Sequence, residues 1–105
     1  MDTDLVFRAL ADAGRRALLD RLFDRNGQTL GELTEGMAMS RQAVAKHLAI
    51  LEAAALVTTL RRGREKLHYL NPVPIAKIAD RWIGKFEKAR VEALVALKKE
   101  LEKPQ

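Results

Sequence analysis

The segment SRQAVAKHLAILEAAALV, residues 40 to 57, keeps one side of a predicted helix free of core-forming side chains. That free side consists of Arg41, Gln42, Ala45, Lys46 and Ala49. An α-helix fits the major groove of duplex DNA, and the residues near its N-terminus reach the base edges. The Arg41 guanidinium matches the O6 and N7 acceptors of guanine, and the Gln42 amide matches adenine. Ala45 and Ala49 are small enough for close approach to a groove, and both are also good helix formers in any setting.

The other side of the same helix is apolar at a regular spacing. Its residues, four, three and four positions apart, are Val44, Leu48, Leu51 and Ala55. This spacing is typical of a stripe buried against the rest of a domain. The sequence therefore predicts a helix that is held by one face and leaves the other face to a partner.

Two further residues of the segment have alternative roles. Ser40 stands where helix amides and the helix dipole attract a phosphate, so its hydroxyl either caps the helix or shares in that contact, and both roles are compatible. His47 either packs between helices or contacts a phosphate. The chain has two histidines, His47 and His68, and a pair of histidines alone is a poor zinc site. We therefore predict neither a metal nor another cofactor.

A second basic group follows directly behind this helix. Residues 56 to 62 include several β-branched types, Gly63 marks a turn, and Leu67 and Tyr69 fall on one side of the returning strand, which predicts a β-hairpin over about residues 56 to 71. The cations of the hairpin are Arg61, Arg62, Arg64 and Lys66. These side chains either straddle a phosphate chain or enter the adjacent minor groove, which positions a protein on DNA.

The elements that hold these two groups are predicted from their caps. Thr3 caps a first short helix and Asp12 caps a second, which ends at Asn26-Gly27. Thr29 and Glu32 form a capping-box pattern, so a third helix opens at residue 30 and runs to about residue 36. Together with the helix that begins at residue 41, it forms a helix-turn-helix over about residues 30 to 53, and the basic hairpin makes the unit winged.

A last helix is predicted over about residues 74 to 101, with Pro74 in its first turn. At about 1.5 Å per residue it approaches 40 Å, longer than so small a domain covers by itself. Its apolar positions extend almost to the C-terminus, so part of this stripe requires another chain.

Composition supports the same class of protein. A chain of 105 residues with 48% hydrophobic content predicts one domain, modestly stable alone, and the elements described above make it mainly α. The net charge of +5 is concentrated in residues 40 to 70, which hold six Lys/Arg and two Asp/Glu, whereas residues 1 to 39 hold five and seven. There is no cysteine, no run of 18 apolar residues and no signal-type segment, so we expect a cytoplasmic protein that does not enter the membrane.

Two other classes of function compete with DNA binding. An enzyme requires converging acid, base or nucleophile residues, and the carboxylates here are scattered at ordinary helix-surface spacings. We therefore predict no catalysis. A winged helix can also serve as an adaptor that binds a protein through its exposed face. Salt discriminates the two, because duplex affinity falls steeply with ionic strength while a protein interface responds less.

The chain resembles the ArsR/SmtB family of bacterial winged-helix repressors over nearly its full length. The matching blocks are FRALADAGRRALLDRLF at 7 to 23, TLGELTEGMAMSRQAVAKHLAILEAAALV at 29 to 57 and RRGREKLHYLNP at 61 to 72. The chain departs from the family pattern at Ala45, where serine is usual, and at Ala38 and Ala55, where glycine is usual.

The resemblance implies a homodimer, joined through the first and last helices, that represses transcription from an inverted repeat near its own promoter. The residues expected at the dimer contact are Leu5, Ile78, Trp82, Ile83, Phe86, Leu94 and Leu97. Metal-sensing members use cysteines near the third helix or Asp/His pairs on the last helix, and this chain has neither. It is most similar to the metal-free branch, in which Trp82 and Phe86 would form dimer core or a ligand box, and the inducer is not identified.

Overall fold

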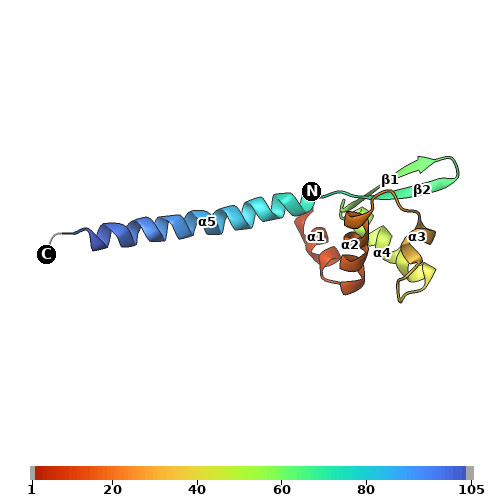
Figure 1. Cartoon of the computed structure of the whole chain (residues 1–105), viewed down its shortest axis with the longest axis horizontal. Helices are drawn as coiled ribbons and strands as arrows, with labels where there is room; N and C mark the ends of the chain where they lie inside the picture. The colour runs from red at the N-terminus through yellow and green to blue at the C-terminus, as the bar shows by residue number, and fades with distance from the viewer. Residues whose placement is uncertain (1, 104–105) are drawn as a thin grey trace. The chain divides into compact units, whose positions relative to one another are not determined.

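The computed structural model describes residues 2–103, which form five helices and one antiparallel hairpin (Figure 1). In chain order these elements are α1 (Thr3–Leu10), α2 (Ala13–Asp24), α3 (Leu30–Thr34), α4 (Arg41–Ala53), β1 (Val57–Arg62), β2 (Glu65–Leu70) and α5 (Val73–Leu101). The predicted winged helix-turn-helix fold, mainly α with a hairpin wing, is confirmed. The chain divides into two compact units, Met1–Ile75 and Ala76–Gln105. The assignment of all 105 residues to one domain stays a prediction.

Short polar side chains start the helices of the first unit. Asp12 caps α2, with its carboxylate 2.8 Å from the Gly14 amide, and Ser40 caps α4, with its hydroxyl 3.1 Å from the Ala43 amide, as predicted. The prediction for α1 is wrong by one residue, because Asp2 is the cap and Thr3 is already helical. The Asp2 carboxylate accepts from two amides of the first turn, which a threonine hydroxyl matches less well beside a positive helix end.

The connection between α2 and α3 is longer than predicted. α2 ends at Asp24, and Arg25 is extended, so Gly27 with its φ of 77° forms part of the following turn instead of the helix stop. The predicted capping box of α3 is present: the Thr29 hydroxyl lies 3.2 Å from the Glu32 amide, and the Thr29 amide 3.1 Å from the Glu32 carboxylate. α3 ends at Thr34, two residues short of the prediction.

The core of the first unit is built around α4, which contacts α1, α2, α3 and β1 (Figure 1). The predicted stripe of Val44, Leu48 and Leu51 is buried. Ala55 is not part of it: Ala54 is the buried residue, whereas Ala55 is exposed and has a φ of 60°. The helix ends at Ala53, so the chain has already turned away at Ala55 and the helical spacing no longer applies.

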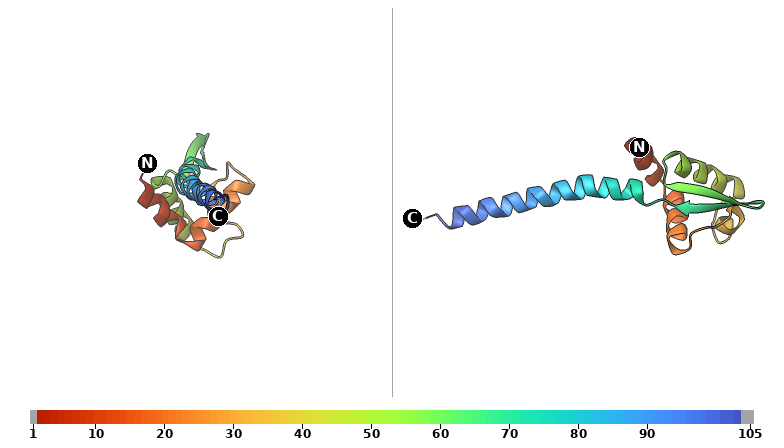
Figure 2. Two further views of the ribbon diagram at one scale, coloured as in Figure 1. Left: turned by 90° about the vertical axis from the view of Figure 1, so that its left-hand side faces the viewer. Right: turned by 90° about the horizontal axis from the view of Figure 1, so that it is seen from above.

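The hairpin leaves the helices as a two-stranded ribbon with its turn at the free end (Figures 1 and 2). The strands pair from Val57 with Leu70 to Arg62 with Glu65, and Gly63, with φ 62°, opens the two-residue turn. This is the position at which a type II′ turn requires glycine. Leu67 is buried and Tyr69 half-buried on one face, as predicted, but His68 on the opposite face is buried as well. Both faces of the inner end of β2 are therefore covered.

The second unit consists of the greater part of α5, a single helix through Leu101 (Figure 2). Apolar side chains along it are exposed in the single chain: Trp82, Ile83, Phe86, Val91, Leu94, Val95, Leu97 and Leu101. Lys98 and Lys99 lie in the last turn, where positive charge favours the helix dipole. Within residues 2–103, none of the helices has the length and apolar character needed to span a bilayer.

Candidate nucleic-acid interface

Helix α4 presents the predicted contact residues to solvent. The exposed set consists of Ser40, Arg41, Gln42, Ala45, Lys46 and Ala49. On the opposite side, Val44 and Leu51 are fully buried, so α4 cannot rotate about its axis without exposing its own core. The N-cap hydroxyl of Ser40 is engaged with the Ala43 amide and still faces solvent, which is compatible with both of its predicted roles. The packing thus fixes which α4 residues can meet a partner.

His47 is turned toward α2 instead. Its Nδ1 lies 3.4 Å from Arg15 Nη1, and because arginine only donates, Nδ1 accepts. A Cβ on Gly14 would lie 3.2 Å from His47 Nε2, so the glycine permits this close approach of α2 and α4. These contacts support the packing alternative for His47, and a phosphate contact stays a prediction.

Arg15 joins three elements, which the sequence did not reveal. Its Nε donates to the Ala9 carbonyl at 2.8 Å and its Nη2 to the Arg8 carbonyl at 3.0 Å, so it satisfies the C-terminal carbonyls of α1. The pKa of Asp12 is lowered first by the Arg15 amide and also by the Gly14 amide, both of which donate to its carboxylate. Burial, the second-largest effect, raises it, and the Arg15 guanidinium lowers it further. The sequence alone does not predict this role of Arg15, because its acceptors on α1 and its contact with His47 come together only in the folded chain.

Arg21 likewise donates to backbone carbonyls at the C-terminal end of α3. Its guanidinium donates to the carbonyls of Leu33 at 2.6 Å and Glu32 at 3.0 Å, and also to that of Glu35. Arg16 donates to the Leu10 carbonyl at 2.7 Å. These arginines stabilise helix ends within the protein, so the positive charge of α2 is largely committed to the scaffold.

The base of the wing is tied to the helices through Gln28 and His68. Gln28 is 3% exposed and its side-chain amide donates to the carbonyls of Arg21 and Arg25 at the end of α2. The backbone carbonyl of Gln28 accepts from the His68 backbone amide at 2.8 Å and from His68 Nδ1 at 2.9 Å. An isolated antiparallel bridge between Gln28 and His68 therefore holds β2 against the loop before α3 and restricts movement of the wing at its base.

The predicted wing cations are all exposed: Arg61, Arg62, Arg64 and Lys66. Two of them have acidic neighbours in the folded chain. Arg62 lies 3.5 Å from Glu65 across the turn, and Lys66 lies 3.6 Å from Glu52 in the last turn of α4. The Arg62–Glu65 pair is largely solvent-exposed, where an ion pair contributes about 0–1 kcal/mol, whereas the Lys66–Glu52 pair is only partly exposed.

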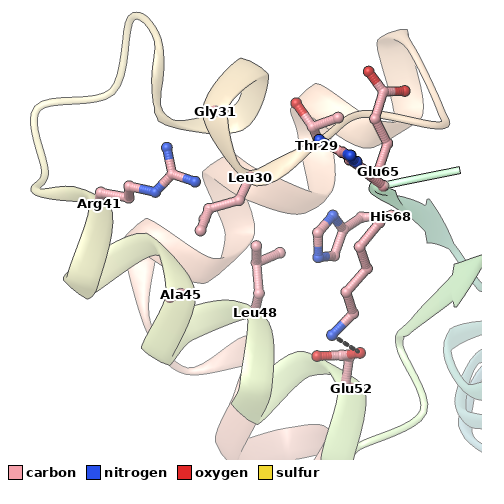
Figure 3. A pocket seen from close by; sticks show the side chains of 11 residues that line it. Thr29, Leu30, Gly31, Arg41, Ala45, Leu48, Glu52, Glu65 and His68 are labelled. Atoms are coloured by element: carbon pink, nitrogen blue, oxygen red, sulfur yellow. Dashed lines mark ion pairs between the residues drawn. The ribbon is translucent and has the colours of Figure 1, made fainter. Parts of the chain in front are cut away.

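A hollow of about 470 Å³ separates α4 from the wing, and we call it the wing hollow (Figure 3). Leu30 and Leu48 form its apolar floor, and the buried His68 closes one side. Its charged walls carry Arg41 and Glu52 from α4 and Arg64, Glu65 and Lys66 from the wing. Predicted contact residues from both elements thus line one concave surface, together with Glu52, which was missed although it shares a helical face with Arg41 and Ala45.

Residues 2–103 hold no group of three or more His, Cys, Asp or Glu side chains arranged to bind a metal ion. The metal-free character of the chain stays a prediction, and its two histidines have the protein partners described above.

Comparison with known proteins agrees with this architecture. A family model described as "Helix-turn-helix domain" matches residues 8–59. The HTH-type transcriptional regulator YuzN of Bacillus subtilis is 42% identical over 86 residues, which cover 76% of this chain and 94% of that protein. The transcriptional repressor SdpR of the same species is 33% identical over 66 residues, covering 63% of this chain and 72% of that one.

A solved structure extends the likeness to almost the whole chain. An ArsR-like transcriptional regulator from Rhodococcus sp. RHA1 superposes with a TM-score of 0.76 at 32% identity, covering 97% of this chain and 92% of that one. Sequence and fold therefore agree, and the chain belongs to the ArsR family of winged helix-turn-helix transcriptional regulators.

Proposed function

We propose that this transcriptional regulator binds an inverted-repeat operator as a homodimer and represses transcription, including that of its own gene. In each subunit the N-terminal half of α4 enters the major groove, and the wing contacts the neighbouring backbone or minor groove. One observation carries the proposal: Arg41, Gln42, Ala45 and Lys46 form an exposed face on a helix whose opposite stripe is fully buried.

The proposed roles divide between reading and positioning. Arg41 and Gln42 read base edges, Ala45 allows close approach, and Lys46 meets the backbone at the groove edge. Arg61, Arg62, Arg64 and Lys66 position the wing through phosphate contacts. Ser40 adds a phosphate contact at the start of α4, where the helix dipole favours negative charge.

Dimerisation is proposed from the apolar surface of α5. Trp82, Ile83, Phe86, Leu94 and Leu97 are all exposed in the single chain, Ile78 is half-buried, and Leu5 on α1 is 36% exposed. A contiguous apolar stripe of this kind on a soluble regulator marks an interaction site. A second copy is the simplest occupant, because a two-fold dimer matches the symmetry of a palindromic operator.

Repression is proposed from similarity, since SdpR is a transcriptional repressor. We further propose that the protein acts in the cytoplasm, where the DNA is, and catalyses no reaction.

The proposal is tested by selecting duplex fragments from the source genome with the purified protein, then measuring affinity as a function of salt. We expect enrichment of sequences with two-fold symmetry. If about six phosphates are contacted, affinity should fall by roughly three orders of magnitude between 50 and 200 mM salt. No enrichment, or an affinity that hardly changes with salt, would instead favour the adaptor alternative.

A further inference from the structure

We propose that one DNA sugar-phosphate strand runs through the wing hollow, and that Glu52 weakens this contact by holding Lys66 in an ion pair. The inference rests on the proposed function and adds to it an acidic residue that limits affinity for every sequence.

The course of the strand follows from the shape of duplex DNA. Adjacent major and minor grooves are separated by one backbone, so a protein with α4 in the major groove and the wing beyond it must have that backbone between the two elements. The space between α4 and the wing is the wing hollow, which Arg41 lines from the start of α4 (Figure 3). Arg64 and Lys66 line it from the wing. The wing cations suit a polyanionic chain that passes between them and α4, beside Arg41, which the proposed function assigns to base edges.

Glu52 stands on this path because of the helical repeat of α4. Arg41, Ala45, Leu48 and Glu52 are four, three and four residues apart, so all four line the hollow. A carboxylate at the end of this face repels a phosphate chain. Glu52 also forms an ion pair with Lys66 of the wing, drawn as the dashed line at Glu52 in Figure 3.

The register of the hairpin explains what the carboxylate does without DNA. Arg61 and Lys66 are directly paired across the strands, so two positive side chains share one face of the wing. Like charges in this arrangement repel each other. Glu52, 3.6 Å from the Lys66 ammonium, offsets the repulsion and joins the wing to α4.

With DNA present, the same pair becomes a competition. The Lys66 and Glu52 side chains are 46% and 31% exposed, so a phosphate can approach the ammonium, but only by displacing Glu52 or sharing Lys66 with it. Lys66 therefore contributes less to binding than its charge suggests. Removing the negative charge of Glu52 frees it.

The test is Glu52→Gln, which keeps the size of the side chain and removes its charge. We expect binding to specific and random duplexes to tighten by about three- to tenfold at physiological salt, and the salt slope to steepen by up to about 0.9 as the phosphate contact of Lys66 becomes complete. Glu35→Gln is the matched control, since it makes the same charge change at an exposed residue outside the wing hollow.

A double-mutant comparison isolates the competition from a general change of charge. Lys66→Met should weaken binding by less than about twofold in the wild-type chain and by fivefold or more in the Glu52→Gln chain, because Lys66 is free only in the second. Circular dichroism melting confirms that each variant is folded. Equal losses in the two backgrounds, or a Glu52→Gln chain that binds like Glu35→Gln, would overturn the inference while leaving the proposed function intact. A wild-type chain that binds no duplex would overturn both.

Discussion

At the scale of single residues, charge alone does not separate the binding surface from the scaffold. Arg15 and Arg21 are as basic as Arg41, yet their guanidinium groups are used by the carbonyls of α1 and α3. Arg41 and Gln42 differ because their side chains are exposed on a helix whose opposite side is buried in the core. Neutral Gln42 is the better test of sequence reading, because its loss changes hydrogen bonds to bases without changing the electrostatic attraction to phosphates.

Gln42→Ala should abolish discrimination at one or two base pairs of each half-site. The expected cost on the preferred operator is about 1–3 kcal/mol, since a side-chain amide contacts an adenine edge through two hydrogen bonds. Binding to a panel of single-base operator variants measures this change, with random duplex as the control that should be unaffected. A variant with the full wild-type preference would remove Gln42 from the reading set.

Asp12 provides a pH prediction at the same scale. The pKa of its carboxyl is lowered from the ordinary 3.8, chiefly by the Arg15 amide that donates to it. Because the pKa is lower in the folded chain, the ionised carboxylate stabilises the native state when the pH is above its ordinary pKa. This contribution is lost as the pH falls through the lowered pKa.

Asp12→Asn should therefore flatten the loss of stability below about pH 4, because asparagine still caps a helix but does not titrate. Urea unfolding from about pH 5 to about pH 2 measures the difference. Some pH dependence should remain in the variant, since the pKa of Glu32 is also lowered, first by the Thr29 amide. An identical pH profile in the variant and the wild type would contradict the assignment.

At the scale of elements, the features predicted best from the sequence are those that depend on residues close together in the chain. The Thr29 and Glu32 capping box and the Gly63 turn involve residues within a few positions of each other, and both are confirmed. The wing hollow depends on long-range packing instead. Glu52 and Lys66 are fourteen positions apart, and only the fold of α4 against the hairpin brings them together. The same is true of Arg15 and His47.

The junction between α4 and β1 carries a local strain that can be measured. Ala55 has a φ of 60°, a left-handed conformation that costs a residue with a Cβ about 1–2 kcal/mol and costs glycine almost nothing. Ala55→Gly should stabilise the protein by about 0.5–1 kcal/mol, after allowance for the greater freedom of glycine in the unfolded chain.

Thermal melting measures the effect of this substitution. The matched control is Ala53→Gly, two residues earlier, which should lower stability by up to about 1 kcal/mol because Ala53 is still helical. Opposite signs for the two substitutions would establish that the conformation of Ala55 is the cause. Destabilisation by both would show that Ala55 is not strained.

At the scale of the whole molecule, the proposed operator binding requires two chains. Trp82 is 42% exposed in the single chain, with the Arg81 guanidinium 5.7 Å and the Lys85 ammonium 5.8 Å from its ring centre. A large aromatic ring in an apolar stripe is typical of a residue that dominates the affinity of an interface.

Trp82→Ala should raise the dimer dissociation constant at least tenfold, equivalent to about 1.4 kcal/mol. Sedimentation equilibrium measures it, and the first unit should stay folded because an exposed ring leaves no cavity there when it is removed. Asp80→Ala is the control, since two residues back place it about 160° around the helix from Trp82. A Trp82→Ala chain that dimerises as tightly as the wild type would contradict a role in the interface.

The pairing of the hairpin limits how this surface can change over evolutionary time. Side chains alternate between the faces of a strand, so a shift of one residue between Val57 and Leu70 would turn Leu67 into water and drive Lys66 inward. Insertions are harmless only beyond the last pair, Arg62 with Glu65. Related sequences can therefore differ in the length and charge of the turn between Arg62 and Glu65, whereas the paired strands at the base of the hairpin must keep their register.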